Sequence, residues 1–143
     1  MNPYQQFAKR LFDLLGGSQA VRIIVPGFMP LAVEEIHPSD EGRRQISLVH
    51  YGEQNGDLMR DPEIVFELHV AGDDTYAEPV YFRNDYAGVE NFVYTTREER
   101  AGVTVKLGSP RGKNEVKSFA HMWFRNLHAQ GFFDRDASRE VLS

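Results

Sequence analysis

The sequence of 143 residues contains no cysteine. This excludes a disulfide-stabilised scaffold, a cysteine-ligated zinc site and a thiol nucleophile. No run approaches the roughly 20 apolar residues that a membrane span needs, and the first residues lack the apolar stretch of a signal peptide. A glycine-rich phosphate loop and a Gly-x-Ser-x-Gly nucleophile turn are also missing. We therefore expect a cytoplasmic protein with no membrane association and no cofactor.

What the sequence does contain is typical of a globular domain, with 41% hydrophobic and 26% charged residues. The net charge of −5 is unevenly distributed. Residues 52–90 hold ten acidic residues against two arginines, whereas residues 91–143 hold six acidic and nine basic residues. An acidic centre repels nucleic-acid phosphates and favours basic partners or cations.

Two segments have helical spacing. Residues 3–15 carry one apolar stripe and are followed by Gly16–Gly17, which suits the left-handed end of a helix. Ser109-Pro110 offers a start for a second helix, but Gly112 favours a later start near Asn114, and the helix should end at Gly131. Its apolar stripe consists of Val116, Phe119, Ala120, Trp123 and Leu127.

Between these helices, alternating segments predict strands. They are residues 29–36, 45–51, 63–70, 79–86 and 89–95, with a short edge strand at 102–107. Asn55-Gly56 is a strong hairpin-turn signal. We therefore predict an α+β fold, an antiparallel meander of about five strands with the N-terminal and C-terminal helices packed on one face. Residues 1–133 would form a single domain, and 134–143 a polar tail that is loose or disordered.

The most distinctive segment is the acidic stretch from Tyr51 to Leu68. Clustered carboxylates bind hard cations, so one hypothesis is a metal-dependent phosphodiesterase or nuclease. It would use Asp57, Asp61, Glu63 and Glu67. The alternative is structural: Asp57 and Asp61 cap turns through backbone N–H groups, and Arg60 pairs with a neighbouring acid.

Residues 79–90 combine tyrosine, arginine and aspartate on a predicted strand. Tyrosine and arginine are enriched at protein-interface hot spots, although strand aromatics also pack across a sheet. We predict that the acidic segment and this strand together bind a protein partner. The predicted protein-binding residues are Glu53, Asp57, Asp61, Glu63, Glu67, Tyr81, Arg83, Asp85 and Tyr86.

Histidines and basic residues offer weaker signals. His50 and His69 lie on strands expected to pair, and they would form a two-histidine site if they approached each other. A basic cluster near two aromatic residues is the one candidate for contact with phosphates. It consists of Lys106, Arg111, Lys113, Lys117 and Arg125, with Trp123 and Phe124 nearby. The isoelectric point near 5.5 argues against nucleic acid as the main partner.

Three stretches carry a resemblance to a known family: YGEQNGDLMRDPEIVFEL, PVYFRNDYAGVE and SFAHMWFRNLHAQGF. Together, over Gln45–Phe132, they resemble an uncharacterised family of small proteins carried by bacterial plasmids, integrative elements and phages. The resemblance implies an accessory gene of a mobile element and assigns no catalytic residue. Our leading hypothesis is a non-enzymatic protein that acts by protein–protein interaction, in defence evasion or element maintenance. A homodimer through an edge strand or the Trp123 helix is a third hypothesis.

Overall fold

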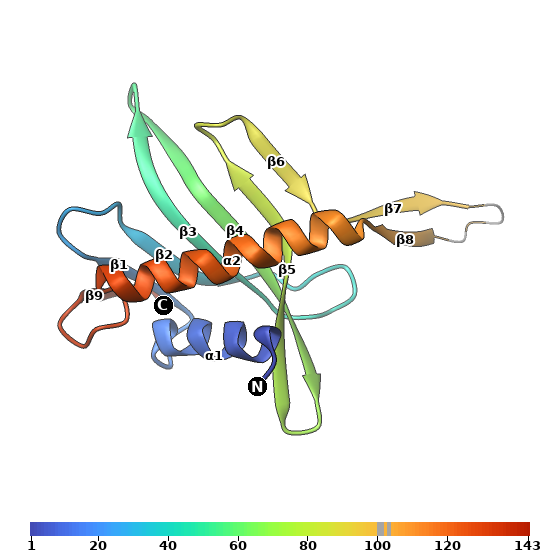
Figure 1. Ribbon diagram of the computed structural model, residues 1–143, viewed down its shortest axis with the longest axis horizontal. Coiled ribbons are helices and arrows are strands. Elements are labelled where there is room, and N and C mark those ends of the chain that lie inside the picture. The colour runs from blue at the N-terminus through green and yellow to red at the C-terminus, as the bar shows by residue number, and fades with distance from the viewer. Residues whose placement is uncertain (100–101, 103) are drawn as a thin grey trace.

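A computed structural model describes residues 1–99, 102 and 104–143, and shows two helices packed in front of a twisted sheet (Figure 1). The elements in chain order are α1 (Pro3–Leu15), β1 (Ala20–Ile24), β2 (Leu31–Ile36), β3 (Gln45–Gln54), β4 (Asp57–Ala71), β5 (Asp74–Asn84), β6 (Val89–Phe92), β7 (Tyr94–Glu98), β8 (Thr104–Gly108), α2 (Pro110–Gln130) and β9 (Ser138–Val141). The strand predicted at 102–107 corresponds to β8, and Val103 lies outside the described residues.

Seven strands form one sheet in the order β6-β5-β4-β3-β2-β1-β9, and every neighbouring pair is antiparallel. The remaining two, β7 and β8, form a separate ribbon that projects from the body (Figure 1). The predicted α+β class, the antiparallel meander and the two terminal helices are confirmed. The sheet is larger than the expected five strands. Among the described residues, neither helix is long and apolar enough to cross a membrane.

Helix α1 begins and ends as the sequence predicts. The Asn2 side chain accepts a hydrogen bond from the Gln5 backbone N–H, and the Gln5 side chain accepts one from the Asn2 N–H. These reciprocal bonds satisfy donors that the first turn leaves free. Gly16, in the left-handed conformation with φ of 59°, ends the helix.

Helix α2 begins earlier than expected. Its N-cap is Ser109, whose hydroxyl accepts a 3.2 Å hydrogen bond from the Gly112 N–H, and Pro110 occupies the first turn. The prediction of a start near Asn114 was wrong because Gly112 supplies a capping donor in the first turn, where glycine costs little. The helix ends at Gly131 as predicted, and Phe132 behind it is fully buried.

One face of the sheet packs against both helices, and we call it the helix face. Its strand residues alternate with the polar positions, and the central ones have no exposed surface: Leu31, Val33, Ile46, Leu48, Ile64 and Phe66. Phe7 of α1 and Phe124 of α2 meet Phe66 with ring centroids 5.6–5.9 Å apart. These three rings join the two helices to the sheet in one core.

The opposite side of the sheet, which we call the outer face, follows from the same alternation. The registers Ser47↔Val65↔Tyr81 and Glu63↔Arg83 place these side chains together, with Glu67 next to them on β4. The Asn55-Gly56 turn that joins β3 to β4 is confirmed, since both residues have positive φ, 52° and 84°. Asp57 and Asp61 lie within strand β4, so the interpretation that they cap turns was wrong.

Three further expectations about strands were wrong. The segment 89–95 is not one strand: it breaks at the buried Val93, so that β6 belongs to the main sheet and β7 to the ribbon. Strand β1 was missed. The polar end, expected to be loose, forms β9, which pairs with β1 from Val21↔Val141 to Ile24↔Ser138. All four side chains of β9 are exposed, so the strand is held by its backbone pairing with β1 and not by burial of its side chains.

Candidate functional site: the outer face of the sheet

Part of the predicted protein-binding set forms a connected group at the β4–β5–β6 corner of the outer face. Arg83 Nε donates to Asp85 Oδ1 at 2.6 Å, and its Nη1 lies 3.8 Å from Glu90. Glu90 also accepts a 3.1 Å hydrogen bond from the Tyr81 hydroxyl. Arg83 therefore connects a turn carboxylate to one on the edge strand and holds β6 against β5.

The same corner is tied to β4. The backbone N–H of Arg60 donates to Asp85 Oδ2 at 2.8 Å, and the Arg60 guanidinium lies 3.3 Å from Glu63. The bond from the Arg60 N–H, together with the Arg83 guanidinium, holds the pKa of Asp85 below its ordinary value. The expectation that Arg60 pairs with a neighbouring acid is confirmed. Glu63 also accepts a 2.7 Å bond from the Ser47 hydroxyl on β3.

Tyr86 lies in the turn after β5 and reaches across to β3. A Cβ atom added at Gly52 would come within 2.5 Å of the Tyr86 hydroxyl and 3.1 Å of the Met29 sulfur. Glycine at this position is therefore what lets the tyrosine pack against the strand. With 45% of its surface exposed, Tyr86 still presents one side of its ring to solvent.

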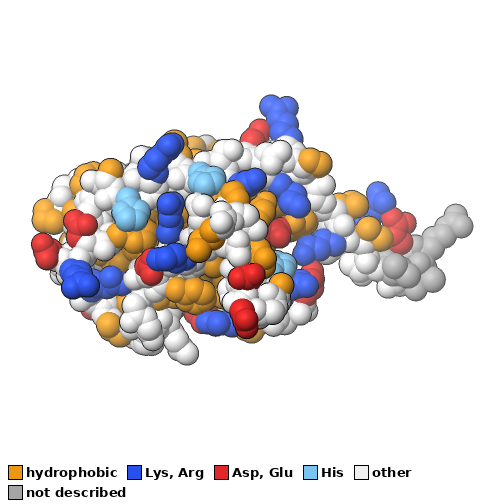
Figure 2. All heavy atoms as spheres, turned by 60° about the horizontal axis from the view of Figure 1, so that its bottom comes forward, with side chains coloured by type: hydrophobic (Ala, Val, Ile, Leu, Met, Phe, Trp, Pro, Cys, Tyr) orange, Lys and Arg blue, Asp and Glu red, His pale blue; other side chains and the backbone are white. Residues whose placement is uncertain are grey.

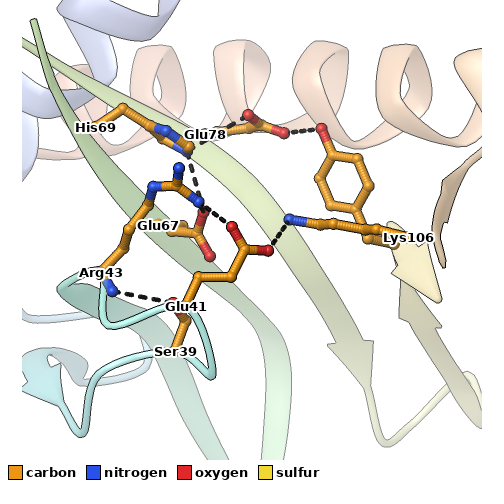
Figure 3. A network of polar contacts seen from close by, with 8 residues as sticks. Ser39, Glu41, Arg43, Glu67, His69, Glu78 and Lys106 are labelled. Carbon is orange, nitrogen blue, oxygen red and sulfur yellow. Dashed lines mark hydrogen bonds and ion pairs between the residues drawn. The ribbon is translucent and has the colours of Figure 1, made fainter. Parts of the chain in front are cut away.

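A second group lies further along the outer face, around Glu67 (Figure 3). Only 5% of Glu67 is exposed. Its Oε1 lies 3.1 Å from Nε2 of His69, and the same nitrogen lies 3.6 Å from Glu78 on β5. Glu78 in turn accepts a hydrogen bond from the Tyr94 hydroxyl at the start of β7. The chain of contacts thus runs from the centre of the sheet to the ribbon.

Two cations from distant segments complete this second group. Arg43, from the loop after β2, lies 3.5 Å from Glu67 and also pairs with Glu41. Lys106 of β8 donates to Glu41 at 2.9 Å (Figure 3). Lys106 and then Arg43 lower the pKa of Glu41, and Glu41 raises that of Lys106. These pairs connect the loop after β2 to Glu67 on the sheet and to Lys106 on the ribbon.

A groove of about 520 Å³ opens between the two groups. Its apolar and aromatic lining includes Val65, Tyr81, Phe92 and Tyr94. Phe92 is 61% exposed, and its ring centroid lies 5.0 Å from that of Tyr81. The groove therefore has an aromatic lining, and its carboxylates Glu41 and Glu67 form ion pairs with Lys106 and Arg43.

The carboxylates of the nuclease hypothesis are distributed over different surfaces. Asp57 is exposed at the tip of the β3–β4 hairpin, near the equally exposed Glu53. Asp61 accepts a 2.8 Å bond from Asn84, and its charge acts on the buried His50 on the helix face. Glu63 and Glu67 lie on the outer face. Within residues 1–99, 102 and 104–143, no three His, Asp or Glu side chains are placed to hold a metal ion.

His50 and His69 do not approach each other. His50 lies on the helix face against Trp123 and Phe132, with ring centroids 5.6 and 5.3 Å away, and burial lowers its pKa. His69 lies on the outer face with Glu67. The two-histidine site was therefore a wrong expectation, because the pleat sends the two rings to opposite sides of the sheet.

The residues of the outer face that sequence reasoning missed include Glu41, Arg43 and Phe92. Lys106 was predicted as a phosphate contact and is instead an ion-pair partner. Glu41 and Lys106 are 65 positions apart, so no local pattern connects them. The sequence did contain one signal for these partners. Residues 52–90 hold ten acids against two arginines, so any of these acids that are buried need cations from other segments.

The fold and the outer face thus define an α+β protein with a polar, aromatic groove on an antiparallel sheet. Residues 5–133 match the family described as a domain of unknown function, DUF6908, and the chain belongs to that family. No curated protein and no solved structure matches the chain.

Proposed function

We propose that this protein is a non-enzymatic accessory protein of a bacterial mobile element, acting in the cytoplasm by binding another protein through its outer face. The proposed process is evasion of host defence or maintenance of the element. The context rests on the resemblance carried by the three stretches between Gln45 and Phe132.

The observation that carries the binding proposal is the groove between the two polar groups. Phe92 offers exposed aromatic surface beside the half-buried Tyr81 ring, and Glu41 and Glu67 line the groove with carboxylates. Aromatic anchors surrounded by a polar rim are typical of protein-interface hot spots. The partner that fits is a protein segment with an aliphatic or aromatic side chain flanked by Lys or Arg.

The test is a capture experiment with purified protein in host lysate, at about 0.05 M and about 0.5 M salt. Wild type is compared with Phe92→Asp and with the matched control Met122→Asp, which alters an exposed hydrophobic residue on α2. We expect a partner that wild type and the control retain and Phe92→Asp loses, since a hot-spot loss above 2 kcal/mol weakens binding roughly 30-fold. High salt should weaken retention.

Three results would overturn the proposal. One is that no captured protein depends on Phe92. Another is cleavage of labelled DNA or RNA by wild type with Mg²⁺ that Glu63→Gln abolishes, which would favour the phosphodiesterase. The third is light scattering that shows a dimer disrupted by Phe92→Asp, which would make the outer face a contact between copies of the chain.

A further inference from the structure

The exposed surface of the helix layer carries basic side chains in a regular arrangement. Lys113, Lys117, His121 and Arg125 follow one another on α2 at intervals of four residues, which places them along one ridge of the helix. Arg10 of α1 lies beside this ridge, with its guanidinium carbon 5.9 Å from the centre of the Phe124 ring. We call Arg10, Lys113, Lys117 and Arg125 the cationic row.

Aromatic rings support three members of the row. The ammonium of Lys117 lies 5.4 Å from the centre of the Tyr4 ring, and that of Lys113 lies 5.2 Å from the Tyr94 ring. The neighbouring Tyr94 hydroxyl raises the pKa of Lys113. Cation–π contacts of this kind hold a charge in place without neutralising it. The row therefore keeps its positive charge, with Arg125 exposed and Arg10, Lys113 and Lys117 half-buried.

None of the four cations forms an ion pair with a carboxylate in the described part of the chain. The chain has 21 acidic residues against 16 basic ones, so partners are not scarce. The nearby acids are used elsewhere: Asp13 pairs with Lys9 and Glu115 with Arg111. Lys, Arg and His side chains are visible beside exposed hydrophobic ones on the side that carries α1 (Figure 2).

We propose that the cationic row binds the sugar–phosphate backbone of nucleic acid. From Lys113 to Arg125 the row extends about 18 Å at about 1.5 Å per residue. One strand of B-form DNA presents a phosphate every 3.4 Å or so along its axis. Because about 18 Å is roughly half a turn of the duplex, only the phosphates on the near side lie within reach of a straight row.

The acidic isoelectric point of the whole chain does not oppose this surface, because the nearby acids Asp13 and Glu115 already pair with Lys9 and Arg111. Lys106 and Arg111, part of the basic cluster in the sequence, are engaged by Glu41 and Glu115. Trp123 is 5% exposed and belongs to the core. The row that remains is a different set, with Arg10 contributed by the other helix. The row adjoins the proposed protein-binding groove at Tyr94, which contacts Lys113 and also lines the groove.

The test measures binding of a labelled 30-nucleotide oligonucleotide, single-stranded and as duplex, by fluorescence anisotropy from 50 to 200 mM salt. Four contacts predict a slope of log K against log salt of about −2.8 for the single strand and about −3.6 for the duplex, which is roughly 50-fold and roughly 150-fold weaker binding over that range. Lys117→Gln with Arg125→Gln should halve the slope. Arg111→Gln, which removes a cation on the same helix outside the row, should leave it unchanged.

Binding of either strand form with these slopes supports the proposal, and the ratio of the two affinities identifies the preferred form. The proposal is overturned if wild type at tens of micromolar does not bind at 50 mM salt. It is also overturned if the double variant keeps the full slope, or if poly-glutamate or phosphatidylserine vesicles bind and the oligonucleotide does not. Melting curves of each variant confirm that it is folded, and Phe92→Asp, which disables the groove, should bind the oligonucleotide normally.

Discussion

The two sides of the molecule use their basic residues in opposite ways. On the outer face, Arg43, Arg60, Arg83 and Lys106 each lie within 4 Å of a carboxylate. On the helix layer, the cationic row has aromatic neighbours and no carboxylate partner among the described residues. The outer-face pairs commit each of these cations to a carboxylate of the protein. The cationic row leaves its cations available to a binding partner.

The difference also appears in what each arrangement holds together. The outer-face pairs connect segments far apart in sequence, such as the loop that carries Glu41 and the ribbon that carries Lys106. The members of the row lie on helices already fixed by the Phe7, Phe66 and Phe124 core. Removing a charge should therefore affect stability on the outer face and leave it nearly unchanged on the helix layer.

The largest expected effect is at Glu67. Glu67→Ala should lower the free energy of unfolding by about 1–3 kcal/mol, because it removes a carboxylate that is only 5% exposed and that both His69 and Arg43 contact. Urea denaturation measures the loss. The control is Glu115→Ala, which removes an exposed pair with Arg111 and should cost less than about 1 kcal/mol. Equal effects at the two positions would contradict the contrast between a buried network and a surface pair.

The next effect is the pH dependence of stability that the buried His50 should produce. Burial holds the pKa of His50 below its ordinary value of 6.5, so the unfolded chain binds the proton more tightly than the folded one. The contribution of His50 to the free energy of unfolding is fully present above pH 6.5. It is lost as the pH falls below that value toward the pKa of the folded state. The slope reaches at most about 1.4 kcal/mol per pH unit.

Denaturation curves at pH 7.5, 6.5 and 5.5 test this, with His50→Phe as the comparison because it keeps an aromatic ring against Trp123 and Phe132. The variant should show a flatter dependence in this window, whatever its absolute stability. An identical pH dependence in the two proteins would show that His50 does not titrate differently on folding.

The smallest effect is expected in the cationic row. Lys117→Gln and Arg10→Gln should each change the free energy of unfolding by less than about 1 kcal/mol, since each loses a cation–π contact and no ion pair. Urea denaturation at low and high salt measures the change. A loss well above that value would mean that the row is part of the scaffold, and would remove the contrast between the two sides.

The elements that the sequence predicted well have local causes. Helix α1 follows from the Phe7–Leu11–Leu14 stripe and Gly16, and the hairpin turn from Asn55-Gly56. Each signal lies within a few residues of the structure that it determines. The α+β class could be derived from the order of these segments alone.

The candidate site was less predictable because its groups come from separate parts of the chain. Six predicted residues, Asp61, Glu63, Tyr81, Arg83, Asp85 and Tyr86, lie on β4, β5 or the turn after β5, whereas Glu67 joins a different group. The partners of Glu67 and the edge strand β9 depend on pairing between distant segments. Strand β9 carries only exposed residues, so its sequence has no periodic signal to read.

The Asn55-Gly56 turn has a consequence for the order of events during folding. A hairpin closed by two residues brings neighbouring segments together and forms within about 1–10 μs, faster than contacts between distant segments. The β3–β4 register shifts by one residue between Val49 and Tyr51, so the turn and this shift together determine which side of the sheet Glu63 and Glu67 face. A slip of one position would turn both carboxylates toward the core. We expect this pairing to form before the loop and the ribbon that carry Arg43 and Lys106 pack beside Glu67.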